Sequence, residues 1–164
     1  MKLLIASIAT VFLACSSSIA AAETWINTLG SSDGVAIQGY DTVAFFTEKK
    51  AVAGKPELSH EWAGAKWLFA TEENLTQFKQ SPEKWAPQYG GHCALGVSDG
   101  YVSKKPTSGR FEVKGEKLYL FPSGTNSPSG AYDDWGRKGG PSRRIPQADK
   151  NWPQLKASLE AKGK

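Results

Sequence analysis

The run Tyr89-Gly90-Gly91-His92-Cys93 holds the side chains of this 164-residue chain that are best suited to chemistry. The other cysteine, Cys15, lies in an N-terminal stretch with the features of a signal peptide. Removal of that stretch leaves Cys93 alone, whereas the cysteines of exported proteins normally pair. A lone exported thiol predicts a metal ligand, a reactive or intermolecular thiol, or a small buried side chain. The residue types leave all three readings open.

The expected position of Cys93 favours a thiolate. Residues 92–97 are predicted to form a brief helix, which places Cys93 near the helix start. Unsatisfied amides and the helix dipole there can lower a cysteine pKa from about 8.5 to roughly 3.5–7.5. Gly90 and Gly91 would let the backbone approach a ligand closely, although such a pair is equally common in a plain turn. Tyr89 could donate to a ligand near Cys93 or lie half-buried in the core.

The inventory of soft metal ligands is short. The only methionine is the first residue, so the mature chain offers Cys93, His60 and His92. A closed structural zinc site needs four ligands, usually in local pairs, and the sequence has no such pair. A looser site could bind Cu(I) or another transition-metal ion through Cys93 with His60 or His92. Asp41 and Tyr40 are further candidates for that site.

Each of these candidates also has a structural reading. His92 and Cys93 are neighbours, and neighbouring side chains diverge in a strand or a helix, so they could share an ion only from an irregular loop. His60 falls on an expected strand, where a surface histidine is commoner than a ligand. Asp41 follows Gly-Tyr, a setting in which aspartate more often forms a turn. Tyr40 could equally be a core residue.

The sequence indicates a binding protein rather than an enzyme. His92 is poorly placed to act as a base for its neighbour Cys93, which leaves only His60. The sequence contains no paired carboxylates, phosphate-binding glycine loop or nucleophile-elbow motif. Hydrolase and transferase activities therefore have no anchor in these motifs.

The N-terminus predicts export. Lys2 precedes an apolar stretch at 3–14, and small residues at 20–22 offer a cleavage site after Ala22. The apolar stretch is shorter than the ~20 residues of a membrane-spanning helix, so we expect no transmembrane segment after processing. Lipid attachment at Cys15 is the less favoured alternative. The mature protein is expected in the periplasm or secreted.

The charge and length indicate one ordinary domain. Residues 1–22 contain one lysine and no acid, so their removal lowers the net charge from +4 to +3. Scattered lysines on an exported chain argue against a nucleic-acid partner. A protein partner or a homodimer remains compatible with the sequence.

Hydrophobic patterns and turn residues predict an α+β fold. A short strand, a turn and a buried segment are expected within 34–47. Two hairpins are expected at 58–69 and 110–120, with short helices between them at 71–97. An irregular Gly/Ser/Pro-rich excursion is expected at 122–146, and a C-terminal helix at 147–164. No internal repeat is evident.

Several segments together resemble the exported YHS-domain proteins of bacteria. They are Val35-Ala36-Ile37-Gln38-Gly39-Tyr40-Asp41, the hairpin at 62–69, Phe78, Ser81-Pro82-Glu83-Lys84-Trp85 and Tyr89-Gly90-Gly91-His92-Cys93-Ala94. The resemblance covers residues 34–121, and residues 148–153 resemble the end of that family. It implies a small α+β fold and kinship with short YHS modules of copper-transporting ATPases, which are suspected of binding metal. Those modules carry cysteines at positions that match Ala70 and Asn74 here.

The sequence therefore predicts an exported YHS-domain protein that binds or handles a copper-type transition metal through Cys93. The alternatives are a thiol-based redox or sensing protein acting through Cys93, and a non-catalytic partner-binding domain.

Overall fold

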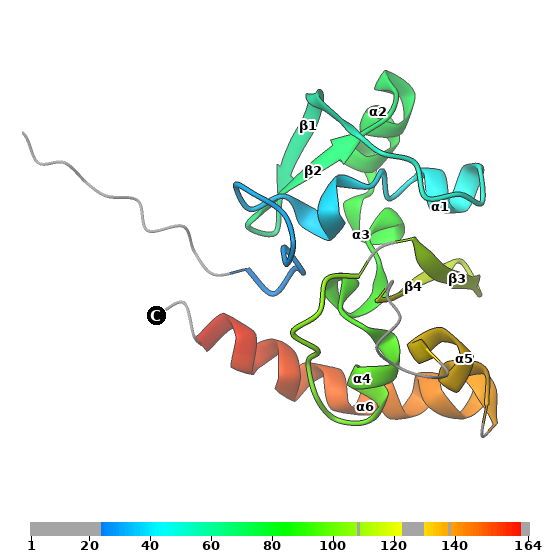
Figure 1. Ribbon diagram of the computed structural model, residues 1–164. Coiled ribbons are helices and arrows are strands. Elements are labelled where there is room, and N and C mark those ends of the chain that lie inside the picture. The colour runs from blue at the N-terminus through cyan, green and yellow to red at the C-terminus, as the bar shows by residue number, and fades with distance from the viewer. Residues whose placement is uncertain (1–23, 108, 123–129, 138, 162–164) are drawn as a thin grey trace, which may run out of the picture.

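The computed structural model describes residues 24–107, 109–122, 130–137 and 139–161. The elements follow in the order η1 (Ala36–Gly39), α1 (Ala44–Thr47), β1 (Lys55–Trp62), β2 (Ala65–Phe69), α2 (Glu72–Gln80), α3 (Pro82–Trp85), η2 (Gln88–Gly91), α4 (Ala94–Ser98), β3 (Arg110–Lys114), β4 (Lys117–Phe121), α5 (Gly130–Gly136) and α6 (Gly140–Ala161). Two antiparallel hairpins, short helices and a C-terminal helix packed on α4 confirm the predicted α+β fold (Figure 1). The expected signal peptide at 1–22, with Cys15, lies outside the described residues.

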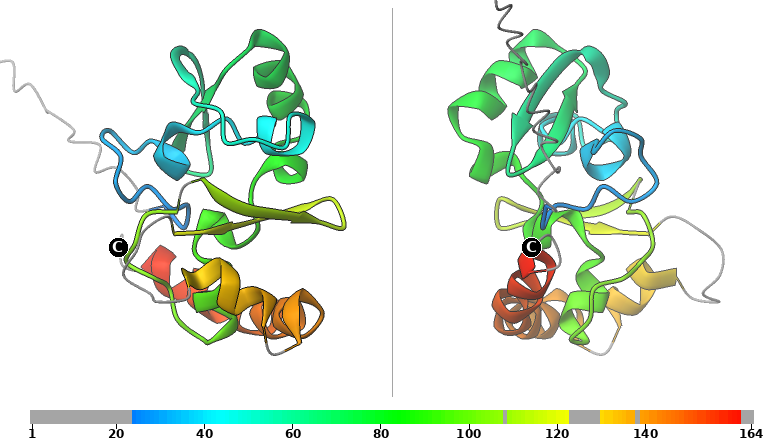
Figure 2. Two further views of the ribbon diagram at one scale, coloured as in Figure 1. Left: turned by 45° about the vertical axis from the view of Figure 1, so that its right-hand side comes forward. Right: turned by 90° about the vertical axis from the view of Figure 1, so that its left-hand side faces the viewer.

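The β3–β4 hairpin lies between two halves of the molecule, and β4 belongs to the core of both (Figure 2). Side chains alternate between the faces of a strand. Leu118 and Leu120 accordingly join the upper cluster, the buried core around Trp67, Phe69 and Phe78. The next residues of β4 join the lower cluster, which contains Tyr89, Cys93, Ala94, Val97, Tyr119, Phe121, Trp135 and Ala148. One strand therefore connects two hydrophobic cores.

The upper cluster forms where α2 covers the β1–β2 hairpin. Trp67 and Phe69 share a face of β2, and their rings lie 5.2 and 5.0 Å from the ring of Phe78 on α2. Thr71 caps α2, because its hydroxyl accepts a hydrogen bond from the backbone N–H of Asn74 at 3.1 Å. The hairpin and the capped helix match the predictions.

The lower cluster corrects the prediction for 122–146. Instead of a continuous irregular excursion, α5 covers 130–136 and α6 already begins at Gly140. Pro146 and Pro153 lie inside α6, where a proline costs about 3 kcal/mol of helix stability. Tertiary packing offsets that cost, because α6 presents an apolar face to the lower cluster. None of the helices in the described ranges has the length and apolarity of a membrane span.

Residues 34–47 also differ from the prediction. A strand is expected there, but the chain forms η1 followed by α1. Ile37 and Gln38 have left-handed backbone, with φ of 42° and 56°. A β-branched residue rarely adopts that region, so tertiary contacts must hold it there. The buried side chain of Ile37 packs in the upper cluster.

Asn27 joins η1 to η2. Its carbonyl accepts from the N–H of Ile37 at 2.8 Å, and its own N–H donates to the carbonyl of Gly90 at 2.8 Å. Its side-chain Nδ2 donates to the carbonyl of Gly91 at 3.1 Å and to Oγ1 of Thr107 at 3.0 Å. This buried asparagine therefore ties the N-terminal segment to both turns.

Replacement of Asn27 by alanine is expected to lower the free energy of unfolding by about 2–4 kcal/mol, because buried partners lose their hydrogen bonds. Urea denaturation followed by fluorescence measures the change. Gln77→Ala, at an exposed amide whose side chain donates only to Glu73, serves as the control and should change stability by less than about 0.5 kcal/mol. Equal effects of the two substitutions would contradict the role given to Asn27.

Candidate functional site

Cys93 lies between η2 and α4, at the N-cap position of α4, and its side chain makes no capping hydrogen bond. Its side chain belongs to the lower cluster and is only 4% exposed. The backbone amides of Leu95 and Gly96 approach the thiol and favour its ionised form. The predicted position before a helix is therefore correct.

The low pKa expected for Cys93 is not found in the structure. Burial raises the pKa of the thiol above its ordinary value, and this effect outweighs the two amides of Leu95 and Gly96. Removal of water destabilises a thiolate more than two backbone dipoles of a five-residue helix stabilise it. At neutral pH the free side chain is a protonated thiol.

The glycines before Cys93 serve packing. A Cβ at Gly90 would lie 2.4 Å from the carbonyl oxygen of Trp25, and one at Gly91 would lie 2.5 Å from Cγ2 of Ile37. Both positions also have left-handed φ, 60° and 80°. The close backbone approach expected at Gly90 and Gly91 is thus made to the N-terminal segment and to η1.

His92 is buried without a hydrogen bond. Its ring is 5% exposed, and neither Nδ1 nor Nε2 has a partner among the described residues. Its ring centroid lies 6.2 Å from that of Trp152 on α6. Burial lowers the pKa of His92 to about 4. The nearby backbone of Trp25 acts in the opposite direction, but it does not form a hydrogen bond with the ring. His92 is therefore a neutral imidazole at pH 7, and within the described part of the chain nothing bonds to its nitrogens.

The two tyrosines named as candidates have structural contacts. Tyr89 donates its hydroxyl hydrogen to Oδ1 of Asp149 at 2.9 Å, which fastens η2 to α6. Burial, with Asp149 second, raises the pKa of Tyr89. Tyr40 is half-buried, and its ring lies 6.4 Å from that of Phe45. Of the two, Tyr89 is the one that belongs to the cluster of Cys93.

Asp41 is a fully buried structural carboxylate. Its Oδ1 accepts from the backbone N–H of Val43 at 2.9 Å and of Ala44 at 3.3 Å, at the start of α1. Its Oδ2 accepts from the N–H of Ala70 at 2.8 Å and from Nδ2 of Asn74 at 2.8 Å. Four donors use the oxygens that a metal ion would need. The turn-forming alternative for Asp41 describes the structure better than the ligand alternative.

His60 and Cys93 belong to different halves of the molecule. His60 is on β1 opposite Trp67, and its ring lies 6.3 Å from that of Phe78 in the upper cluster. Cys93 belongs to the lower cluster, on the other side of β4. Across the described ranges, no group of three or more His, Cys, Asp and Glu side chains could hold a metal ion. The structure thus leaves His92 and Cys93 as the candidate ligands.

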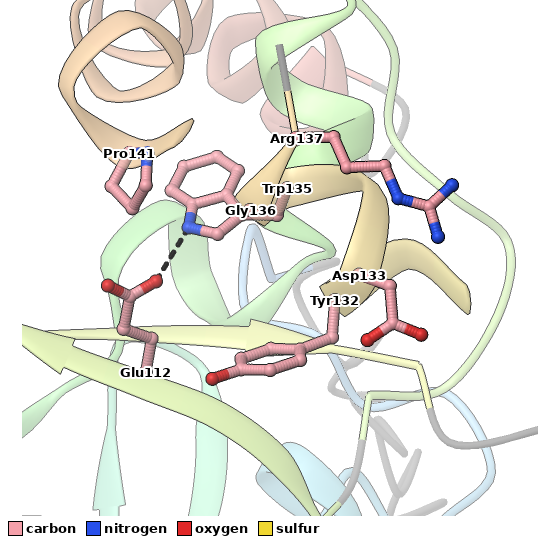
Figure 3. Close-up of a pocket in the computed structure, with 7 residues that line it drawn as sticks. All are labelled: Glu112, Tyr132, Asp133, Trp135, Gly136, Arg137 and Pro141. Carbon is pink, nitrogen blue, oxygen red and sulfur yellow. Dashed lines mark hydrogen bonds between the residues drawn. The ribbon is translucent and has the colours of Figure 1, made fainter. Parts of the chain in front are cut away.

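The sequence did not indicate the hollow between β3 and α5, which has a volume of about 480 Å³ (Figure 3). Glu112, Tyr132, Asp133, Trp135, Gly136, Arg137 and Pro141 line it. Glu112 accepts a hydrogen bond from Nε1 of Trp135 at 2.7 Å across its floor. None of the candidate site residues lines this hollow, and Arg137 pairs with Asp134 at 3.5 Å. Glu112 and Trp135 are far apart in the sequence and belong to no recognisable motif, so no signal in the sequence indicated this hollow.

The pKa of His92 makes stability depend on pH. The unfolded chain binds the imidazole proton near pH 6.5, whereas the folded chain binds it only near pH 4. Stability from the buried neutral ring is therefore full above pH 6.5 and falls by up to about 3 kcal/mol as the pH drops toward 4. Urea denaturation at pH 7 and 4.5 should show a smaller loss for His92→Phe than for the wild type. An identical loss in both proteins would exclude His92 as the source.

Asp41→Asn should lower the free energy of unfolding by about 2–4 kcal/mol. The new amide NH₂ group would point at hydrogen-bond donors that now bond to a carboxylate oxygen, and it cannot accept from them. Thermal and urea denaturation measure the loss. Asp33→Asn, at an exposed loop position, is the matched control. A stable Asp41→Asn protein would show that the carboxylate is not needed for the fold.

Comparison with known proteins gives no relative from which a family could be assigned. No protein-family model, curated protein or solved structure matches this chain. The YHS-domain resemblance thus stays an expectation drawn from the motifs.

Proposed function

We propose that this chain is an exported metal-handling module of the YHS type. It binds Cu(I) or a similarly soft transition-metal ion through Cys93, with His92 as the second ligand. The observation that carries the proposal is the buried imidazole of His92, which has no partner at either nitrogen among the described residues and precedes Cys93, the only thiol expected in the mature chain. Buried polar groups in proteins nearly always have a partner. An unpaired imidazole beside a thiol therefore supports a ligand supplied from outside the chain.

The donor set suits a soft ion. Metal ions bind neutral imidazole, and the lowered pKa of His92 keeps its ring neutral at pH 7. A thiol gives up its proton to a bound metal ion, so the raised pKa of Cys93 does not prevent coordination. Thiolate and imidazole are accepted by copper, and apolar surroundings limit access of water. Such a site supports storage or transfer of an ion.

The backbone restricts how these ligands act together. His92 has ψ of 159°, and Cys93 has φ of −56° and ψ of 113°, so the chain is extended through both residues. Neighbouring side chains of an extended chain leave it in different directions. Joint coordination requires a local adjustment of 89–93, whereas coordination by Cys93 alone does not. Separate substitutions of the two residues distinguish these cases.

The thiol-redox alternative has one observation in its favour and one against it. The amides of Leu95 and Gly96 favour an ionised sulfur, as redox-active cysteines require. Burial nevertheless raises the pKa of Cys93, which makes the free thiol a poor nucleophile at neutral pH. The metal-handling proposal is favoured because coordination does not depend on the pKa of the free thiol.

Anaerobic titration of the mature protein with Cu(I) against a competing chelator tests the proposal. The wild type should bind one ion, and Cys93→Ser should not bind above the level of buffer. His92→Phe should weaken binding roughly tenfold, or ~1.4 kcal/mol, if the imidazole contributes a bond. His60→Phe is the matched control and should bind as the wild type does.

Equal Cu(I) binding by the wild type and a folded Cys93→Ser protein would overturn the proposal. Alkylation of Cys93 as a function of pH in the same preparations tests the alternative. A thiol pKa well below 8.5 would favour a redox role. A slow, unreactive thiol without metal binding would favour a partner-binding domain.

A further inference from the structure

We infer that the described chain contains two copies of one structural unit, and that Cys93 occupies in the second copy the place that Asp41 has in the first. The first unit runs through η1, α1, β1, β2 and α2. The second runs through η2, α4, β3, β4 and α5 in the same order. Each unit is a turn, a short helix, a hairpin and a covering helix, and the inference does not depend on metal binding.

The turns that open the units have the same unusual backbone. Residues 37–39 have φ of 42°, 56° and 76°, and residues 89–91 have φ of 57°, 60° and 80°. Three consecutive left-handed residues are rare outside glycine-rich segments. In both turns the next residue is extended, with φ of −73° at Tyr40 and −71° at His92. Gly39 and Gly91 are thus equivalent, 52 residues apart.

The hairpins keep the same spacing of 52 residues. Ala63 and Gly64 form the two-residue turn between β1 and β2, with φ of 52° and 74°. Gly115 and Glu116 form the turn between β3 and β4, with φ of 56° and 57°. The turn at 37–39 and the hairpin strands and turn at 59–69 therefore correspond to 89–91 and 111–121 at this constant spacing. Few side chains are identical at this spacing, which explains why the sequence shows no evident repeat. The identical pairs are Gly39 and Gly91, Leu68 and Leu120, and Phe69 and Phe121.

An aromatic residue of a later helix packs on each hairpin, although Trp135 lies 57 residues after Phe78 and so does not keep the spacing of the hairpins. Phe78 on α2 packs on Trp67 and Phe69 of β2. Trp135 on α5 packs on Tyr119 and Phe121 of β4, with ring centroids 5.7 and 5.4 Å away. Trp67 and Phe69 correspond to Tyr119 and Phe121 at the spacing of the hairpins. The aromatic core of one unit therefore reproduces that of the other.

Asp41 and Cys93 precede equivalent short helices. Oδ1 of Asp41 accepts from the amides two and three residues later, and the amides at the same offsets from Cys93, those of Leu95 and Gly96, favour the ionised thiol without forming a capping hydrogen bond. Oδ2 of Asp41 also accepts from the N–H of Ala70 after the hairpin. The residue that corresponds to Ala70 is Pro122, which has no N–H.

The second unit therefore lacks the donor that ties the residue before the short helix to the end of the hairpin. A carboxylate at position 93 would miss a hydrogen bond that it has at position 41, whereas a thiol needs no such donor. Cys93 therefore does not make the link to the end of the hairpin that Asp41 makes.

A double-mutant cycle tests the equivalence. Pro122→Ala restores a backbone N–H where the first unit has Ala70. In a Cys93→Asp protein, this change should lower the unfolding equilibrium constant roughly tenfold or more, as expected for a hydrogen bond to a charged group. In the wild-type background it should give no such gain. Urea denaturation at pH 7 measures all four proteins, and Pro153→Ala in α6 is the control that should act equally in both backgrounds.

Equal effects of Pro122→Ala in the two backgrounds would overturn the inference, as would a Cys93→Asp protein that stays unfolded with and without Pro122→Ala. An NMR or crystal structure of the wild type decides independently of these variants. Left-handed φ at 37–39 and 89–91, and joint superposition of 37–47 on 89–99 and of 59–69 on 111–121, are the expected results. Failure of this joint superposition, or a right-handed turn at 89–91, would contradict the duplication.

Discussion

Burial of both faces of β4 is the constraint on which the rest of the structure depends. Leu118 and Leu120 complete the upper cluster, while Tyr119 and Phe121 complete the lower one. A strand with two apolar faces must be covered on both sides, so neither half of the molecule can close its core without the other. The arrangement of β1–β2 and α2 on one side, and of α4, α5 and α6 on the other, follows from this requirement.

Polar contacts then determine how the halves meet. Asn27 bonds to the backbone of both left-handed turns, and Asp41 joins α1 to the start of α2. The buried polar atoms of both side chains have hydrogen-bond partners, and few other side chains could make the same set of bonds. The buried imidazole of His92, by contrast, has no such partner among the described residues. That difference separates the structural polar residues from the candidate ligand.

The sequence predicted those elements whose signals are local. Ala63-Gly64 and Thr71 identify the first hairpin and the start of α2 because turn and cap chemistry depend on adjacent residues. The left-handed turn at Ile37 could not be predicted, since distant contacts hold it against its intrinsic preference. The helices within 130–146 were missed because packing outweighs their glycines and prolines. At the site, residue order located Cys93 before a helix, but burial reversed the expected pKa.

The docking of α6 has a consequence for the rate of any exchange at this site. Trp152 contacts the rings of Trp25, Tyr89 and His92, and Tyr89 is also bonded to Asp149 of the same helix. An ion or oxidant arriving from solvent must therefore wait for a local opening of packed side chains. If Cys93 binds an ion as proposed, its residence time would be set by local opening of the C-terminal helix, and its affinity by the donor atoms beneath that helix.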